Sequence, residues 1–204
     1  MSRDNSDRHQ QILSAAAVLF ARKGVAATTV REIADEVGIL SGSLYHHFES
    51  KEAMVDEILA PYLSHLREAY KTVLASDADP RSRLADLVAA SLQVVEAHPH
   101  ATEIYQSDVN YLSQFARFGY LKTAARDVRK TWLEVLRSGI TAGAFRSDLD
   151  PNIVYRLMRD AIWLSVRWFR PTRDYPLARF AQDCLSLFID GVAVPAVVGS
   201  APIQ

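Results

Sequence analysis

The stretch GILSGSLYHHFESKEAM, residues 38–54, holds the side chains of this chain that look most suited to chemistry. Two adjacent histidines, His46 and His47, lie between a tyrosine and a lysine, and imidazoles serve as metal ligands and as general bases. Neighbouring residues of a helix point about 100° apart, so the two rings cannot hold one ion from one face. The sequence contains no nucleophile elbow, phosphate loop or zinc-hydrolase motif. We therefore expect no metal, no cofactor and no catalytic residue, and an enzyme is the less favoured class.

Composition limits the classes of protein that this chain can belong to. Its 204 residues suit one or two domains, and a hydrophobic content of 49% is ample for a core. The net charge of −1 gives no global sign of a polyanion partner, so any nucleic-acid surface must be local. The single cysteine, Cys184, excludes an intrachain disulfide, and no 18-residue uncharged apolar run is present. We expect a cytoplasmic protein with no membrane partner.

Apolar residues recur at three- and four-residue spacing along most of the chain, which predicts an all-α protein. Gly24 stands where a left-handed cap would end the first helix, and Thr29 with Glu32 forms a capping-box pattern. From residue 194 to 204 no periodic pattern remains, so we expect a disordered tail. The expected helices span about residues 7–23, 29–38, 41–48, 50–75, 80–97, 100–113, 115–142, 151–169 and 176–193.

Two short helices joined by a tight turn, over residues 29–48, have the ingredients of a DNA-binding helix-turn-helix. This motif needs a small residue where the helices cross, a glycine in the turn and an apolar residue facing the core. Ala34, Gly38 and Leu44 meet these demands. A plain helical bundle is the alternative. The small polar residues that begin the third helix favour DNA, because such a helix can lie close to base edges in the major groove.

The segment TTVREIADEVG, followed by GSLYHHFESKEAM, resembles the N-terminal signature of the TetR family of transcriptional regulators, over about residues 10–55. The resemblance implies a homodimer that binds a double-stranded DNA operator and a small effector. The expected fold is then a three-helix helix-turn-helix domain over residues 1–50 and a helical ligand-binding and dimerisation domain over residues 51–193. One departure is Leu40, where family members often carry a small polar residue.

Chemistry and the resemblance together suggest how this domain contacts DNA. Hydroxyl groups at a helix N-terminus and a nearby ammonium group suit phosphates, whereas small residues at the start of the third helix suit bases. The expected phosphate contacts are Thr28, Thr29, Tyr45, His47 and Lys51. The expected base contacts are Leu40, Ser41, Gly42 and Ser43, with His46 as a further candidate. Arg3 and Arg8 belong to a short flexible arm that either reaches a minor groove or lies free on the surface.

The second domain carries candidate residues for an apolar pocket, although a packed helical core explains many of its aromatic residues equally well. Arg159 and Trp163 are four residues apart and share a helix face. An arginine on such an apolar face needs an anionic partner or an aromatic plane. Two interpretations stay open: Arg159 meets an aspartate or a tryptophan at a dimer interface, or it holds an anionic group of a ligand. The candidate ligand contacts are Arg159, Trp163, Tyr105, Tyr111, Phe115 and Trp132.

The run GILSGSLYHHF and the segment VYRLMRDAIWLSVRWFRP also resemble a narrower branch, the TetR-type repressors of steroid (cholesterol) ring catabolism. That resemblance implies an acyl-CoA thioester of a steroid fragment as the effector that releases the protein from a palindromic operator. A TetR-like regulator of another catabolic or efflux pathway, with a different apolar ligand, is the alternative. A non-regulatory architectural DNA binder is a further one.

Overall fold

The computed structural model describes residues 3–192, and this part of the chain is helical without strands, which confirms the all-α prediction. The expected tail over residues 194–204 lies outside the described residues. No helix between residues 3 and 192 has the length and apolar character needed to cross a membrane. The helices are α1 (Arg3–Lys23), α2 (Val30–Glu36), α3 (Ser41–Leu44), α4 (Lys51–Ala75), α5 (Pro80–Ala97), α6 (Pro99–Leu112), the 3-10 turn η1 (Ala116–Phe118), α7 (Tyr120–Thr141), α8 (Pro151–Trp163), α9 (Ser165–Trp168) and α10 (Leu177–Val192).

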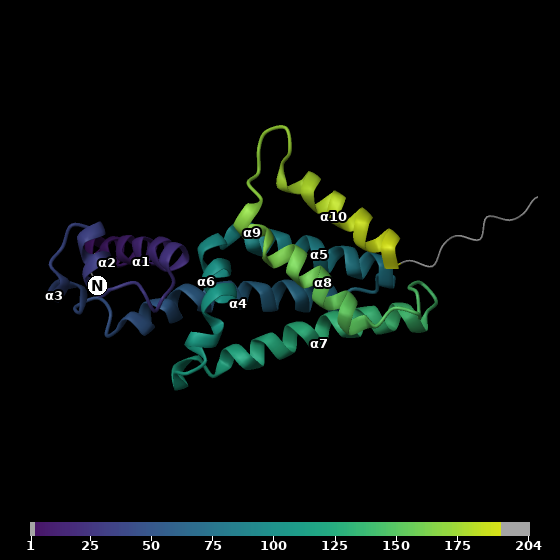
Figure 1. Ribbon diagram of the computed structural model, residues 1–204, viewed down its shortest axis with the longest axis horizontal. Helices are drawn as coiled ribbons and strands as arrows, with labels where there is room; N and C mark the ends of the chain where they lie inside the picture. Colours follow the sequence, from purple (N-terminus) through teal and green to yellow (C-terminus); the bar gives the residue numbers. More distant parts are fainter. Residues whose placement is uncertain (1–2, 193–204) are drawn as a thin grey trace, which may run out of the picture.

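Helices α1, α2 and α3 form a small lobe at one end of the molecule (Figure 1). Helix α1 begins at Arg3, four residues before the expected start, so the expectation of a flexible arm carrying Arg3 and Arg8 is wrong. The guanidinium of Arg8 donates to Gln11 Oε1 and to the backbone carbonyl of Val37, both at 3.0 Å. The bond to Val37 ties α1 to the end of α2.

Local capping signals set the ends of the first two helices. Gly24 and Gly38 have φ angles of +84° and +68°, the left-handed conformation that glycine adopts without strain. The Thr29 hydroxyl accepts from the backbone N–H of Glu32, and the Glu32 carboxylate accepts from the N–H of Thr29. The capping box predicted from the sequence is therefore confirmed.

Helix α4 leaves this lobe and runs into the larger domain (Figure 1). Ser50 caps it by accepting from the N–H of Ala53 at 3.1 Å. At the start of its 25 residues, Met54 and Val55 are buried beside the small lobe. Further along, Tyr62 and Leu66 are buried in the larger domain, where α4 packs against α5, α6 and α7. One continuous helix thus belongs to both parts of the molecule.

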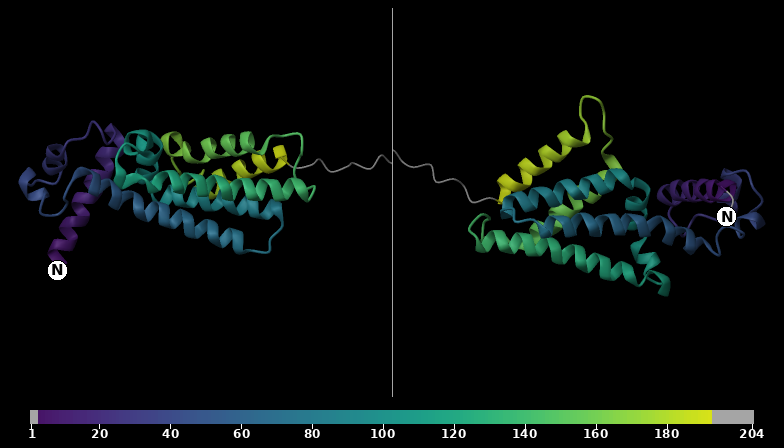
Figure 2. Two further views of the ribbon diagram at one scale, coloured as in Figure 1. Left: turned by 90° about the horizontal axis from the view of Figure 1, so that it is seen from below. Right: turned by 180° about the vertical axis from the view of Figure 1, so that it is seen from behind.

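Helix α5 packs against five others, α4, α6, α7, α8 and α10, and lies at the centre of the larger domain. Figures 1 and 2 show α10 along one edge of this domain and α7 along the other. Helix α7 begins at Tyr120 instead of residue 115, because residues 116–118 form a 3-10 turn that buries the ring of Phe118. The expected helix over residues 151–169 is interrupted at Leu164, which separates α8 from α9.

Candidate DNA-binding surface and effector cavity

The small lobe holds α2 and α3 in the arrangement of a helix-turn-helix. Ile33, Ala34 and Leu44 are fully buried, and Phe48 is nearly so; α2 packs on α1, and α3 packs on α2. In the turn, the N–H of Ile39 donates to the carbonyl of Ala34 at 3.0 Å. The apolar side chains thus leave the opposite side of α3 free to face a partner.

Helix α3 is shorter than expected. It covers Ser41–Leu44, whereas the sequence predicted a helix to Phe48, and residues 45–47 form a turn. Glycine and serine have poor helix propensity, so three of the four residues of α3 favour helix only weakly. The N–H of His46 donates to Ser43 O at 3.2 Å, and the following amides continue the turn.

The outer side of α3 carries exposed side chains of several kinds. Leu40 is 80% exposed and Tyr45 is 57% exposed, and a Cβ atom added to Gly42 would meet no atom within 4 Å. His46 is exposed, whereas Ser41, Ser43 and His47 are half-buried. These residues form the surface expected to meet DNA, and their individual contacts with bases or phosphates stay predictions.

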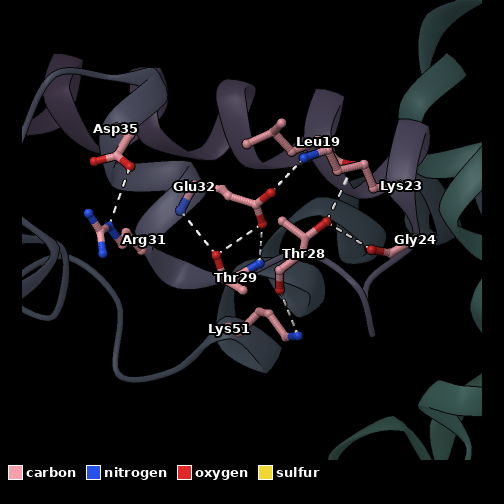
Figure 3. A network of polar contacts seen from close by, with 9 residues as sticks. All are labelled: Leu19, Lys23, Gly24, Thr28, Thr29, Arg31, Glu32, Asp35 and Lys51. Atoms are coloured by element: carbon pink, nitrogen blue, oxygen red, sulfur yellow. Dashed lines mark hydrogen bonds and ion pairs between the residues drawn. The ribbon is translucent and has the colours of Figure 1, made fainter.

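Thr28 has a different role from the one expected (Figure 3). Its side chain is 1% exposed, and its hydroxyl donates to the backbone carbonyls of Gly24 at 2.8 Å and Leu19 at 3.4 Å. The hydroxyl closes the end of α1 and does not face outward. The expectation that this hydroxyl binds a phosphate is therefore wrong, because it is buried and already donates to carbonyl groups that the sequence alone does not reveal.

Lys51 is half-buried and holds the same turn (Figure 3). Its ammonium group donates to the carbonyl of Val25 at 2.6 Å and to that of Thr28 at 3.0 Å. An ammonium has three donors, so one remains for a phosphate. Lys51 thus has a structural role that the sequence did not reveal, and its phosphate contact stays a prediction.

Thr29 and its neighbours form an exposed polar cluster (Figure 3). Glu32 accepts from the Thr29 N–H at 2.8 Å, from the Thr29 hydroxyl at 2.9 Å and from Lys23 Nζ at 2.5 Å. The bond from Lys23, together with those from Thr29, lowers the pKa of Glu32 to about 2. A phosphate at Thr29 must therefore compete with an ionised carboxylate. On the same helix, Arg31 has an 83% exposed side chain and pairs loosely with Asp35 at 3.8 Å, and it is not among the residues that the sequence predicted to contact DNA.

The histidines of the lobe take part in packing. His9 stacks on Phe48 with ring centroids 4.1 Å apart and lies 2.7 Å from a Glu57 carboxylate oxygen. His47 approaches the His9 ring at 6.5 Å. No cluster of three or more histidine, cysteine or carboxylate side chains placed to bind a metal occurs between residues 3 and 192.

The larger domain contains a cavity of about 530 Å³ among α4, α6, α7 and α8. Three of the candidate ligand contacts named from the sequence, Arg159, Trp163 and Tyr105, line it. Its other lining residues are Tyr62, Leu63, Leu66, Gln106, Val109, Ala125, Arg126, Val128, Arg129, Tyr155 and Arg156. The cavity therefore combines an aromatic and aliphatic wall with arginines, which suits a ligand that is partly apolar and partly anionic.

Four arginines surround this cavity. Arg126 and Arg156 form no salt bridge with any residue that the structure describes, and Arg129 donates to Asn152 Oδ1 at 2.8 Å. Arg159 pairs with Asp160 of its own chain at 2.6 Å. This pairing is the weak kind typical of an exposed pair, so an anionic ligand can replace it. Only Arg159 was singled out from the sequence as a ligand contact. Arg156 lies on the same helix, α8, whereas the packing of α7 beside α8 brings Arg126 and Arg129 to the cavity.

Aromatic hydroxyl and indole groups are bonded to one another on the cavity wall. The indole Nε1 of Trp163 donates to the hydroxyl of Tyr62 at 3.0 Å. Burial raises the pKa of Tyr62, and burial likewise raises the pKa of Tyr105 and of Tyr155. The three phenols are neutral at physiological pH, so these side chains supply no negative charge to balance the arginines of the cavity.

Three residues expected in the pocket do not line it. Trp132 is fully buried behind the wall, where its indole N–H donates to Tyr70 at 2.8 Å and its ring lies 6.2 Å from that of Trp163. Tyr111 and Phe115 stack edge to face on each other, 5.2 Å apart, near the end of α6. Trp132, Tyr111 and Phe115 thus lie outside the lining of this cavity, since an aromatic side chain at helical spacing serves a core as readily as a pocket.

A larger cavity, about 730 Å³, lies between α1, the α5–α6 corner and the segment that follows α8. Two of its arginines are already bonded. Arg167 lies 3.2 Å from a Glu103 oxygen, and Arg170 donates to the carbonyls of Val166 and Phe169. This cavity is larger, but its charge is more fully compensated, so the smaller cavity is the better candidate for an anionic effector.

Comparison with known proteins agrees with this arrangement of a helix-turn-helix lobe and a helical cavity domain. Residues 12–58 match the family described as bacterial regulatory proteins, tetR family, and residues 77–192 match the tetracyclin repressor-like C-terminal domain. The chain belongs to the TetR family. This TetR regulator is accordingly a DNA-binding transcription regulator and not an enzyme.

Relatives of this TetR regulator are similar to it over nearly their whole length. The HTH-type transcriptional repressor KstR2 of Rhodococcus jostii is 45% identical over 190 residues, which is 93% of both chains. KstR2 of Mycobacterium tuberculosis is 43% identical over 192 residues, or 94% of this chain and 96% of the relative. A solved structure of the latter, described as a ketosteroid transcriptional regulator, superposes with a TM-score of 0.86 at 44% identity, covering 92% of this chain and 96% of the other.

Proposed function

We propose that this TetR regulator is a cytoplasmic, homodimeric repressor of steroid (cholesterol) catabolic genes. It binds a palindromic operator, and an acyl-CoA thioester of a steroid-ring degradation intermediate releases it. The observation that carries the proposal is the arginine-rimmed aromatic cavity, found in a chain 43–45% identical to KstR2 repressors. The description of one relative as a ketosteroid regulator supports the steroid part.

The charge of the cavity supports an anionic effector. Guanidinium groups bind carboxylates and phosphates with paired, charge-assisted hydrogen bonds. Arg126 and Arg156 are free of carboxylate partners within residues 3–192, so they are the candidates for the phosphates of coenzyme A. The thioester's ring portion fits the apolar wall, with Arg159 at its carbonyl end and Trp163 against its face.

The described part of the chain also supports a dimer. Four large apolar side chains stay exposed on the last helices: Ile153 and Leu157 on α8, Trp168 on α9 and Leu187 on α10. Leu157 and Leu187 are 66% and 75% exposed, more than a solvated face normally shows for such residues. A second copy of the chain is the partner that would cover them, because TetR-type regulators bind as symmetric pairs.

A dimer explains how the small lobe would read DNA. Two copies of α3 enter successive major grooves, about one helical turn apart, so the operator is palindromic. Leu40 offers an apolar contact to a thymine methyl, while Ser41 and Ser43 hydrogen-bond to base edges and Gly42 permits a close approach. Tyr45, His47 and Thr29 bind phosphates beside them, and His46 lies at the edge of the base contacts.

Release follows from a preference of the effector for the state that cannot bind DNA. A ligand shifts such an equilibrium only by its difference in affinity for the two states, and couplings of about 1 to 3 kcal/mol are typical. Because α4 lines the cavity at Tyr62 and enters the small lobe at Lys51, its displacement would change the spacing of the two recognition helices.

A DNA-release assay tests the proposal. An operator fragment, selected from a random DNA pool, is bound by the protein, and the coenzyme A thioester of a steroid-ring carboxylic acid is titrated against the complex. We expect release by the thioester and little release by the free acid or coenzyme A alone. Arg126→Ala and Arg156→Ala should weaken the response, whereas Arg137→Ala, an exposed change elsewhere on α7, should not. Release by unrelated apolar compounds and by no steroid thioester would contradict the effector assignment.

A further inference from the structure

Val25 lies in the turn between α1 and α2, at the junction between the DNA-binding lobe and the larger domain. Its side chain is fully buried, and both polar groups of its backbone bind side chains from distant helices. The N–H donates to Asp108 Oδ1 on α6 at 3.3 Å. The carbonyl accepts from Lys51 Nζ, at the start of α4, at 2.6 Å. A single residue of the turn is thus held by the two helices that continue to the effector cavity.

Helix α6 presents side chains to both the cavity and this turn. Tyr105, Gln106 and Val109 line the cavity, whereas Asp108 is 8% exposed and reaches Val25. Successive residues of an α-helix are about 100° apart around the axis, so Asp108 points away from the cavity row while belonging to the same rigid turn. Any displacement of α6 by a ligand against Val109 therefore moves Asp108 as well.

The Asp108 carboxylate makes few polar contacts besides its hydrogen bond with Val25. Oδ2 is buried and has no hydrogen-bond partner within residues 3–192, and burial raises the pKa of Asp108. Oδ1 lies only 3.4 Å from where a Cβ of Gly24 would stand, so the carboxylate approaches bare backbone at a residue with φ of +84°. When α6 shifts, the Val25 N–H and the carboxylate are both left buried and unpaired, which is costly. Such a contact favours two discrete arrangements over gradual change.

We propose that Asp108 is the residue through which occupation of the cavity is transmitted to the helix-turn-helix. The Asp108–Val25 hydrogen bond holds the α1–α2 turn in the arrangement that binds DNA, and a ligand that displaces α6 breaks it. Lys51 keeps the turn folded from the other side when this bond is absent. The inference rests on the proposed function only in taking the cavity as the effector site.

The test needs no effector, so its outcome is separate from that of the steroid thioester assay. Val109→Trp fills the cavity from the α6 side and stands in for a ligand. Operator affinity is measured for this variant, for Asp108→Ala and for the double variant, using the selected operator fragment. We expect Val109→Trp to weaken operator binding about 5-fold or more, within the usual range of allosteric coupling. In the Asp108→Ala background the same change should have less than about a twofold effect.

Two further variants test whether the coupling between Val109→Trp and Asp108→Ala depends on the Asp108–Val25 hydrogen bond. Asp108→Asn keeps an acceptor oxygen for the Val25 N–H, so Val109→Trp should weaken operator binding in this background as in the wild type. Asn110→Ala changes an exposed neighbour on α6 and should also leave the response intact. Effects of Val109→Trp and Asp108→Ala that simply add would overturn the proposal, as would an unchanged operator affinity for folded Val109→Trp. The thermal midpoint of each variant shows whether it folds. If Val109→Trp does not fold, Gln106→Trp takes its place, with the same expected and contradicting outcomes.

Discussion

Trp163 and Tyr62 join α8 to α4 through one buried hydrogen bond, from the indole N–H to the phenol oxygen at 3.0 Å. Both side chains line the candidate effector cavity, so this bond joins two of its walls. Tyr62→Phe leaves the indole N–H buried without its partner, and we expect a loss of about 1 to 3 kcal/mol in unfolding free energy. Urea denaturation measures it, with Tyr45→Phe, an exposed position, as the control. Equal stability for both variants would show that the bond contributes nothing.

Thr28→Val tests the structural role of the buried hydroxyl. The change removes the donor to the carbonyls of Gly24 and Leu19 while preserving shape. We expect a loss of about 1 to 2 kcal/mol in stability, with the salt dependence of DNA binding unchanged because no phosphate contact is lost. Thr28→Ser keeps the hydroxyl and serves as the control. A smaller slope of log affinity against log salt for Thr28→Val would show that the hydroxyl contacts a phosphate after all.

Lys51→Met removes the charge but keeps the length of the side chain. Because the carbonyls of Val25 and Thr28 lose their donor, and one phosphate contact is lost with it, affinity should fall for all DNA sequences alike. The slope of log affinity against log salt should also fall by about one. Binding titrations at several salt concentrations measure both. A weaker affinity with an unchanged slope would leave Lys51 with only its structural role.

Leu40→Ser replaces the exposed apolar side chain on α3 with the small polar type that the family often has there. Since Leu40 is 80% exposed, we expect no measurable loss of stability. The preferred operator should change at the base that meets this position, with thymine losing its advantage. Selection of DNA sites by both proteins would reveal the change. Identical selected sites would remove Leu40 from the base contacts.

Glu32 gives the small lobe a defined response to acid. Its pKa is lowered from 4.5 to about 2 in the folded protein, chiefly by the bond from Lys23 and then by those from Thr29. Since the folded pKa is the lower one, the carboxylate stabilises the lobe fully above pH 4.5, and this contribution is lost as pH falls towards 2. Thermal midpoints between pH 5 and 2 should fall less steeply for Glu32→Gln than for the wild type. Parallel slopes would disprove the capping role of the ionised form.

Signals that depend on neighbours in the chain predicted the structure well. Gly24, Gly38 and the Thr29–Glu32 pair marked helix ends correctly, because each acts through atoms within four residues of itself. The roles of Thr28 and Lys51 could not be predicted in this way. Their partners are carbonyl groups that only the folded turn brings within reach, up to 26 residues away along the chain.

In the cavity, too, the sequence predicted the residues that are close together in the chain and missed those that only the folded structure brings together. The i, i+4 spacing of Arg159 and Trp163 identified one wall, since both lie on α8. Arg126 and Arg129 lie on α7 with the same regular spacing as many surface residues, and only the packing of α7 beside α8 shows that they face the cavity. Trp132 illustrates the opposite error, because the sequence does not distinguish a core indole from one at a cavity wall.

The candidate effector cavity and the candidate DNA-binding surface have no residue in common. Tyr105, Gln106 and Val109 form the cavity row of α6, which is linked to the small lobe by α4, by the packing of α1 on α6 and by the Val25 turn. Redesign of the cavity for a different small molecule can therefore leave the operator unchanged. This TetR regulator is in that respect a scaffold for biosensors, in which one promoter reports on many engineered ligands.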